Sequence, residues 1–226
     1  MNDSISSRRP LVSVIIVNYN GGHYLQTTVH AVLASTVPIE LFVVDNGSID
    51  DSVWQLERAW AAEPRLRIII NGANLGFARA NNIALERAAG EFLLLLNPDC
   101  IVTEDTLERM VEALRKDPLA GMAGCLIRNP DGSEQPGCRR SLPTPWNSLV
   151  RVLHLDRLLG RRRYLEQVNL LHNPLPEGPV HVEAISGAFM LVRREALNQA
   201  GVMDDNYFLH CEDLDWCKTF QDAGWK

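Results

Sequence analysis

Four short apolar runs within the first hundred residues constrain the fold most: Leu11–Val17, Ile39–Val44, Leu66–Ile70 and Phe92–Leu96. None of them alternates apolar with polar residues, which is typical of strands buried on both faces of a parallel sheet. The stretches between the runs carry apolar residues at helical spacing, so the order of elements is β-α-β-α-β-α-β. This order predicts an α/β fold, with an open, mostly parallel sheet, right-handed crossovers and helices on both faces.

The second half of the chain is less regular. A fourth helix is expected at Thr103–Lys116, with Thr103 as its N-cap. A strong turn signal at Asn129–Gly132 and recurrent prolines predict an irregular insertion over residues 128–179, holding one helix near Trp146–Leu159. Two strands and two helices are then expected, at Val180–Ala184, Ala188–Arg193, Arg194–Ala200 and Asp213–Ala223.

The composition is that of a soluble globular protein and excludes several classes. The 226 residues are 46% hydrophobic and 22% charged, which suits a single domain spanning residues 1–226. The net charge of −6 argues against a dedicated nucleic-acid binder. The cysteines form no CxxC pair, the N-terminus lacks the pattern of a signal peptide, and no apolar run approaches the ~20 residues of a membrane span. We therefore expect a cytoplasmic protein.

One segment, residues 139–163, departs from this acidic balance. It contains one acid, Asp156, and seven arginines: Arg139, Arg140, Arg151, Arg157, Arg161, Arg162 and Arg163. A run of charge is usually a solvated helix face. The alternative is an acceptor platform, because arginine forks suit phosphate and basic residues bind anionic bilayers. On that interpretation the protein contacts the inner face of the cell membrane peripherally and in a salt-sensitive way.

Polar residues follow each of the first four predicted strands. The clusters are Asn18-Tyr19-Asn20, Asp45-Asn46-Gly47-Ser48, Asn71-Gly72-Ala73-Asn74 and Asn97-Pro98-Asp99. Asn, Asp and Gly are ordinary turn formers, so each cluster alone has a simple structural explanation. Ligands of open α/β sheets bind beyond the carboxyl ends of the strands, however, and four clusters at one edge favour a site for a polar ligand.

Three of these side chains have a specific chemistry to offer. The Asp99 carboxylate is an oxygen ligand of the kind that Mg²⁺ or Mn²⁺ takes alongside a diphosphate and water. Asp45 can accept a hydrogen bond from a base imide, and the ring of Tyr19 can stack on a base. The alternatives are a turn or N-cap residue for Asp99 and rim packing for Tyr19.

A second acidic group lies far along the chain, in the segment from His210 to Trp216. It places Glu212, Asp213 and Asp215 at the start of a predicted helix. Acidic residues are favoured at helix N-termini, which would explain one of them. Three neighbouring carboxylates repel one another and exceed what capping requires, so we expect a functional role.

Other templates are absent from the sequence. There is no GxGxxG after the first run, no GxxxxGK[ST] and no GxSxG, which argues against dinucleotide, P-loop and hydrolase sites. A sugar nucleotidyltransferase would need a basic, glycine-rich loop after the first strand, and Asn18–Gly22 contains no Lys or Arg.

Six segments, in this order, carry a resemblance to a known family: VSVIIVNYNG, VVDNGSIDDS, NLGFARANNIAL, LLLNPD, ISGAFMLVRR and FLHCEDLDWCKTFQDAGW. The chain resembles the inverting family 2 glycosyltransferases, and within them the bacterial rhamnosyltransferase-like branch that builds cell-surface polysaccharides. The resemblance covers nearly the whole chain except residues 128–179. It implies a GT-A fold with an acceptor-side insertion at those residues.

The resemblance also implies residue roles. Tyr19 and Asp45 match positions that hold the nucleotide base, and Asn74 and Arg79 match positions lining the nucleotide pocket. Asn18 is assigned to the same nucleotide site. In the metal motif, Asn97 replaces a carboxylate and keeps a weaker, neutral role in nucleotide binding, whereas Asp99 is the retained ligand of Mg²⁺ or Mn²⁺. Asp213 matches the catalytic base, with Glu212 beside it in the catalytic pair.

The implied reaction is a single displacement. Asp213 takes a proton from an acceptor hydroxyl, and the donor is a nucleotide diphosphate sugar such as dTDP-rhamnose or a UDP-sugar. The acceptor is a glycan or a lipid-linked sugar. Relatives continue with another strand and a metal-binding histidine, so the resemblance predicts a domain shortened after Lys226. The main alternative is a catalytically inactive nucleotide-sugar-binding or scaffold domain, consistent with Asn97.

Overall fold

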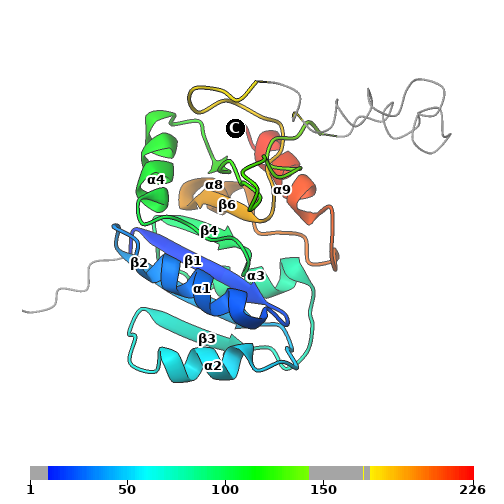
Figure 1. Ribbon diagram of the computed structural model, residues 1–226. Helices are drawn as coiled ribbons and strands as arrows, with labels where there is room; N and C mark the ends of the chain where they lie inside the picture. Colours follow the sequence, from blue (N-terminus) through cyan, green and yellow to red (C-terminus); the bar gives the residue numbers. More distant parts are fainter. Residues whose placement is uncertain (1–9, 143–169, 171–173) are drawn as a thin grey trace, which may run out of the picture.

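A computed structural model describes residues 10–142, 170 and 174–226 of the chain (Figure 1). Its centre is one six-stranded sheet with the strand order β3-β2-β1-β4-β6-β5. The strands are β1 (Val12–Asn18), β2 (Ile39–Asp45), β3 (Leu66–Ile70), β4 (Phe92–Leu96), β5 (Met122–Ala123) and β6 (Phe189–Arg193).

The sheet is mostly parallel, as the apolar runs predicted. β1 pairs in parallel with both β2 and β4, and β2 pairs in parallel with β3. β6 runs antiparallel to β4, and β5 runs antiparallel to β6. The chain moves outward from β1 to β3 and then crosses to the other side of β1 as β4. The strand order therefore reverses between β1 and β4, which is where open α/β sheets bind ligands.

Helices cover both faces of the sheet, which confirms the predicted α/β arrangement (Figure 1). They are α1 (Gly22–Leu33), α2 (Ser52–Ala59), α3 (Phe77–Leu85), α4 (Thr106–Lys116), α8 (Arg194–Ala200) and α9 (Glu212–Asp222).

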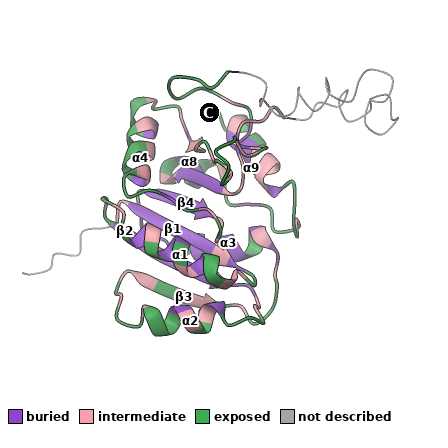
Figure 2. Ribbon diagram, viewed as in Figure 1, coloured by how far each residue is buried: buried purple, intermediate pink, exposed green. Residues whose placement is uncertain are grey.

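Two hydrophobic clusters hold these layers together. One contains Leu25 of α1, Leu56 of α2 and Val111 of α4, packed on one face of the sheet. The other contains Ala84 of α3 and Trp216 of α9 on the opposite face. The residues of β2 and β4 are buried throughout, as the purple central strands of Figure 2 show, because both faces of the sheet are covered.

Two predicted elements of the second half are wrong. Thr103 is not the N-cap of α4, which begins at Thr106, because the Thr103 hydroxyl bonds to Asp105 at 2.7 Å and folds the segment into a turn. Val180–Ala184 forms no strand, because only Ala184 finds a backbone partner, in an isolated antiparallel bridge with Arg140. The short strand β5 was not predicted, since two residues carry no periodicity.

The insertion is described only at its two ends. The predicted turn at Asn129–Gly132 is confirmed, since the backbone N–H of Gly132 donates to Asn129 at 2.8 Å. The helix predicted near Trp146–Leu159 lies outside the described residues. No helix within the described ranges is long and apolar enough to cross a membrane.

Candidate active site

The ends of β1 and β2 meet in a buried hydrogen-bonded group centred on Asn18. Asn18 and Asp45 are register partners, and both are buried. The Asn18 amide Nδ2 lies 3.3 Å from Asp45 Oδ1, 3.0 Å from the Ser48 hydroxyl and 3.0 Å from the Ser52 hydroxyl. The structure therefore brings together two residues that the sequence assigned to the nucleotide site.

Asn18 also holds an unused acceptor. Its Oδ1 is buried without a hydrogen-bond partner among the described residues. A Cβ on Gly21 would lie only 2.3 Å from that oxygen, so glycine at position 21 keeps the space beside it open. A buried carbonyl left unpaired costs roughly 1–3 kcal/mol, which a donor group of a ligand would recover.

The loop after β1 is tied to the loop after β2 by Asn20. Asn20 has a left-handed backbone, with φ 55°, and its Oδ1 accepts from the backbone N–H of Ile49 at 2.8 Å. Its own N–H donates to the Ser48 hydroxyl at 2.9 Å. Tyr19, which precedes Asn20 in the same loop, is 52% exposed, so its ring faces solvent rather than packing into the rim. This exposure leaves the ring available for stacking on a base.

Asn46 organises the next loop, and the sequence analysis did not single it out. Its Nδ2 donates to Asn74 Oδ1 at 2.9 Å and to the Gly76 carbonyl at 3.3 Å. Its Oδ1 accepts from Asn71 Nδ2 at 3.1 Å and from the Leu75 N–H at 3.0 Å. The sequence did contain a signal for a role of Asn46 in the site, because it directly follows Asp45 within one of the four polar clusters.

Asn74 and Arg79 occupy different positions around this loop. Asn74 is exposed, and its Oδ1 also accepts from the Gly76 N–H at 3.0 Å, so its carbonyl shapes the loop. Arg79 is exposed in the first turn of α3, and its side chain makes no ion pair within the described residues. Asn74 is thus joined to the Asn18 and Asp45 group through Asn46, whereas Arg79 is not bonded to it.

The loop after β4 carries the predicted metal ligand. The Asn97 N–H donates to the Ala188 carbonyl at 3.0 Å, and the Pro98 carbonyl accepts from the Thr28 hydroxyl at 2.7 Å. These two bonds fix the backbone directly before Asp99, while Asp99 itself is exposed. No group of three or more His, Cys, Asp or Glu side chains that could hold a metal occurs in the described part of the chain. One exposed carboxylate still fits a hard cation that takes its remaining ligands from a diphosphate and water.

The segment that leads to the second acidic group lies against the loop before α3, which carries the predicted nucleotide-site residue Asn74 and is called the nucleotide loop below. The N–H of Phe77 donates to the Phe208 carbonyl at 3.0 Å, and a Cβ on Gly76 would lie 2.5 Å from that carbonyl oxygen. From Phe208 the chain passes through two left-handed residues, His210 with φ 73° and Cys211 with φ 71°, directly into α9. Left-handed non-glycine residues are uncommon and cluster at functional sites.

Asp213 is held by contacts from two other segments. Its Oδ2 pairs with the Arg140 guanidinium and accepts from the Gly187 N–H at 3.1 Å. Its Oδ1 accepts from the Leu214 N–H at 2.8 Å. The contact with Arg140 was missed, because the sequence places Arg140 in a charged run. It shows that Arg140 faces the acidic group rather than a surface platform.

Glu212 is buried beside Asp213, and its Oε2 has no hydrogen-bond partner among the described residues. Burial raises the pKa of Glu212, and the neighbouring Asp213 charge adds to this, against the opposing effects of its backbone hydrogen bond, His210 and Arg140. The two residues of the predicted catalytic pair therefore have different surroundings: Asp213 is ion-paired, and Glu212 is driven toward its protonated form.

The turn before β6 connects the two halves of the site. Ala188 accepts from Asn97 at the end of β4, and Gly187 donates to Asp213 at the start of α9. The loop with the predicted metal ligand and the predicted base thus both bond to this turn, the loop to Ala188 and the base to Gly187.

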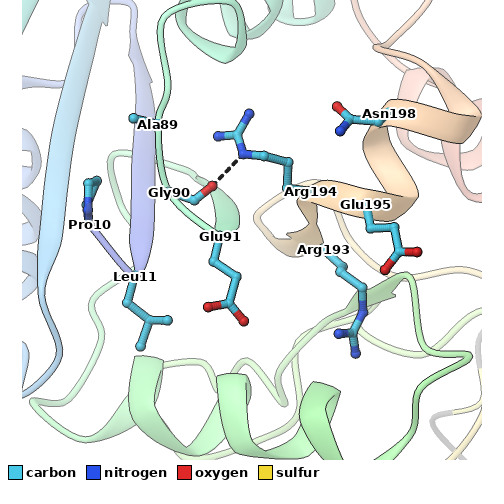
Figure 3. A pocket seen from close by; sticks show the side chains of 9 residues that line it. All are labelled: Pro10, Leu11, Ala89, Gly90, Glu91, Arg193, Arg194, Glu195 and Asn198. Atoms are coloured by element: carbon cyan, nitrogen blue, oxygen red, sulfur yellow. Dashed lines mark hydrogen bonds between the residues drawn. The ribbon is translucent and has the colours of Figure 1, made fainter. Parts of the chain in front are cut away.

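A separate cavity of about 600 Å³ lies at the other end of β1 and β4 (Figure 3). Leu11, Gly90 and Arg194 contribute to its lining. The Arg194 Nε donates to the Gly90 carbonyl at 2.5 Å, so this arginine supports the backbone turn before β4. Because ligands of such sheets bind at the carboxyl ends of the strands, this cavity is not the candidate site.

The fold is that of the GT-A glycosyltransferases: an open α/β sheet whose carboxyl edge gathers polar loops beside an acidic helix start. The chain matches the family model described as Glycosyl transferase family 2 over residues 13–200, and it belongs to that family.

A relative in Mycobacterium tuberculosis, N-acetylglucosaminyl-diphospho-decaprenol L-rhamnosyltransferase, is 31% identical over 231 aligned residues, covering 95% of this chain and 72% of that protein. Mannosyltransferase PcManGT from Pyrobaculum calidifontis, solved with GDP-Man and Mn²⁺, has a TM-score of 0.67 at 20% identity and covers 97% of this chain. GalNAc-T7, solved with UDP, GalNAc and Mn²⁺, has a TM-score of 0.69 at 19% identity and covers 98% of this chain. The chain spans 54% and 42% of these two structures, respectively.

Proposed function

We propose that the chain is an inverting glycosyltransferase that moves a sugar from a nucleoside diphosphate donor to an acceptor hydroxyl in cell-surface polysaccharide synthesis. The observation that carries this proposal is Asp213, a carboxylate fixed by Arg140 and Gly187 at the start of α9. The bond from Phe77 to Phe208 holds that helix start against the nucleotide loop.

The donor nucleotide would lie over the ends of β1 to β3. Exposed Tyr19 would stack on the base, and the Asn18 and Asp45 group would bond to its polar edge. Asn74 and Arg79 would line the pocket, with Asn97 beside the diphosphate. The likeness to the mycobacterial L-rhamnosyltransferase supports a rhamnose donor such as dTDP-rhamnose, and the UDP bound to GalNAc-T7 supports a UDP-sugar as the other candidate.

Asp99, exposed at the carboxyl end of β4, would hold the divalent cation, Mn²⁺ or Mg²⁺. Two of the solved relatives contain Mn²⁺, which supports this assignment. Such a cation supplies charge stabilisation for the departing diphosphate.

The reaction is a single displacement at the anomeric carbon. The acceptor oxygen forms its bond to that carbon as the bond to the diphosphate breaks, and the configuration inverts. Asp213 receives the hydroxyl proton, which is general-base catalysis. Glu212 beside it stays protonated more readily, since burial raises its pKa, so Asp213 is the member of the pair that serves as base.

The name of the mycobacterial relative supports a lipid-linked acceptor with a diphosphate. Residues 128–179 would form the acceptor side. Arg139 pairs with Glu134 and Arg140 pairs with Asp213, so a peripheral membrane contact would depend on the arginines at 151–163, outside the described residues. Sedimentation with anionic liposomes at low and high salt, with Arg161, Arg162 and Arg163 replaced by serine, tests that contact.

The transfer reaction is tested with purified chain, Mn²⁺, and a panel of UDP- and dTDP-sugars. We expect Asp213→Asn to bind donor nucleotide normally but to lose transfer by roughly 10²-fold or more. A chain that binds the nucleotides but turns over none of them would favour the inactive binding or scaffold domain. If Glu212→Gln abolishes transfer and Asp213→Asn does not, the base is assigned to the wrong carboxylate.

A further inference from the structure

Arg140 comes from the insertion, 73 residues before Asp213, yet its guanidinium pairs with the Asp213 carboxylate. Both side chains are only 17% exposed, so this contact is screened less than a surface ion pair. Hydrogen bonds between an arginine and a carboxylate are among the stronger ones in proteins. The reaction assigned above does not by itself require this arginine.

The arginine is built into the fold rather than placed at the end of a loose loop. The Arg140 N–H donates to the Ala184 carbonyl at 3.0 Å, and the Ala184 N–H donates back to Arg140 at 2.9 Å. Its Nη2 also donates to the Ile185 carbonyl at 2.5 Å. Backbone and side chain are therefore both fixed, and the guanidinium has a defined position beside α9.

The bonds to Asp213 divide its two oxygens. Oδ2 receives both Arg140 and the Gly187 N–H, whereas Oδ1 receives only the Leu214 N–H. A carboxylate oxygen can accept two hydrogen bonds, so Oδ1 keeps one acceptor position within the described residues.

We infer that Arg140 is a positioning residue for the base: it holds the Asp213 carboxylate turned so that Oδ1 takes the proton of the acceptor hydroxyl. This inference rests on the proposed function. It also gives the insertion a direct link to the chemistry, because the segment on the proposed acceptor side carries the arginine that orients the base.

Arg140 is the charged partner of Asp213 among the titratable groups around it. The titratable groups that interact with Asp213 or its pair are Glu212 and Cys217 on α9, His210 before it, and Arg140 from the insertion. Within the described residues Arg140 is the cation that contacts the Asp213 carboxylate. Without Arg140, the Asp213 Oδ2 keeps only the Gly187 N–H among its partners in the described residues, and the carboxylate is held less firmly in one orientation.

The test uses Arg140→Gln and Arg140→Lys, with Arg139→Gln as the matched control, because Arg139 is the neighbouring ion-paired arginine and bonds to Glu134 instead. Transfer kinetics at pH 7 give kcat and the KM values for donor and acceptor, and nucleotide binding reports the intact fold. We expect Arg140→Gln to bind nucleotide within about twofold of wild type, to keep the KM for the donor, and to lose roughly 10-fold in kcat, because the carboxylate is no longer held in its reactive orientation.

Arg140→Lys keeps a charged donor at this position, so it should recover part of the lost kcat, and Arg139→Gln should leave kcat within about twofold of the wild type. A kcat that is unchanged in Arg140→Gln, or a loss that appears in KM rather than in kcat, overturns the inference while the proposed function stands. A wild type that transfers no sugar overturns both.

Discussion

Buried amides, more than charges, give the site its shape at the level of single residues. Asn18 joins the ends of β1 and β2, and Asn46 joins the loop after β2 to the loop after β3. Both side chains are almost fully buried, and amides supply donors and acceptors at once. A carboxylate at either position could not donate, so the loops would lose part of their bonding.

Replacing Asn46 by alanine should therefore lower the free energy of unfolding by about 2–3 kcal/mol, because the Leu75 N–H and the Gly76 carbonyl lose a buried partner. Urea denaturation measures the change. Asn206→Ala, at an exposed position bonded only to nearby Asp204, serves as the control and should change stability by less than about 0.5 kcal/mol. Equal losses in the two variants would contradict the role given to Asn46.

The raised pKa of Glu212 predicts how the stability of the folded chain changes with pH. Because burial and then Asp213 raise its pKa in the folded chain above the ordinary 4.5, the folded chain binds this proton more tightly than the unfolded chain. The contribution of this protonation to the free energy of unfolding is fully present at low pH. It is lost as the pH rises from about 4.5 through the pKa that Glu212 has in the folded chain.

Glu212→Gln removes this titration, so the variant should gain stability relative to wild type on going from pH 4.5 to neutral pH. Urea denaturation at several pH values checks this, with exposed Glu112→Gln on α4 as the control. If the stability difference between wild type and Glu212→Gln is independent of pH, the pKa of Glu212 is the same in the folded and the unfolded chain, which would contradict the effect of burial.

At the scale of elements, the site depends on how loops from distant parts of the sequence meet. The loop before α3 touches the segment before α9 at one point, where the Gly76 Cα faces the Phe208 backbone. Gly76 has φ 85° and ψ 167°, a conformation that glycine alone adopts readily. The same conformation occurs at Gly201, with φ 91° and ψ 175°, but there a Cβ would meet nothing within 4 Å.

These two glycines separate backbone strain from the contact between loops. Gly201→Ala should cost about 1–3 kcal/mol through strain alone, whereas Gly76→Ala should cost a further 1–3 kcal/mol, roughly, because its Cβ overlaps the Phe208 carbonyl. Gly76→Ala should also weaken nucleotide binding and transfer, which Gly201→Ala should leave intact. Thermal denaturation and binding assays distinguish them, and equal behaviour of the two variants would argue against a functional contact.

At the scale of the whole molecule, one edge of the sheet collects everything the proposed reaction needs. The reversal of strand order between β1 and β4 separates their loops, and the antiparallel strand β6 brings Gly187 and Ala188 next to the end of β4. Helix α9, which follows α8 in the chain, presents Asp213 to the same edge, where Asp213 bonds to Gly187.

A nucleoside diphosphate with Mn²⁺ should therefore stabilise the whole chain. At about 100 times its Kd a ligand adds ~2.7 kcal/mol, which corresponds to a rise in Tm of roughly 5–10 °C for a protein of this size. Thermal-shift measurements with UDP, dTDP and GDP, each with and without Mn²⁺, give the preference for the base. Asp99→Ala should lose the additional rise in Tm that Mn²⁺ gives. If Mn²⁺ raises the Tm of this variant as much as that of the wild type, Asp99 is excluded as the metal ligand.

The sequence by itself determined the four parallel strands, the helices between them and the sheet edge at which the polar clusters gather. Unbroken apolar runs can be buried only by covering both faces, and the polar clusters must then emerge together at the carboxyl ends of parallel strands. Tyr19, Asp45, Asn74 and Asp99 were accessible to that reasoning because each directly follows a strand or its loop.

Only the tertiary structure decided which side chains meet across long separations in sequence. The bond of Asn46 to Asn74, the contact of Gly76 with Phe208 and the pairing of Arg140 with Asp213 join segments that no local periodicity relates. The charged run hid Arg140, because a sequence shows a residue's charge but not whether packing turns it toward solvent or toward a buried acid. A hydrogen bond or an ion pair forms between groups at a specific distance and angle, and those are fixed by the packing of the whole chain.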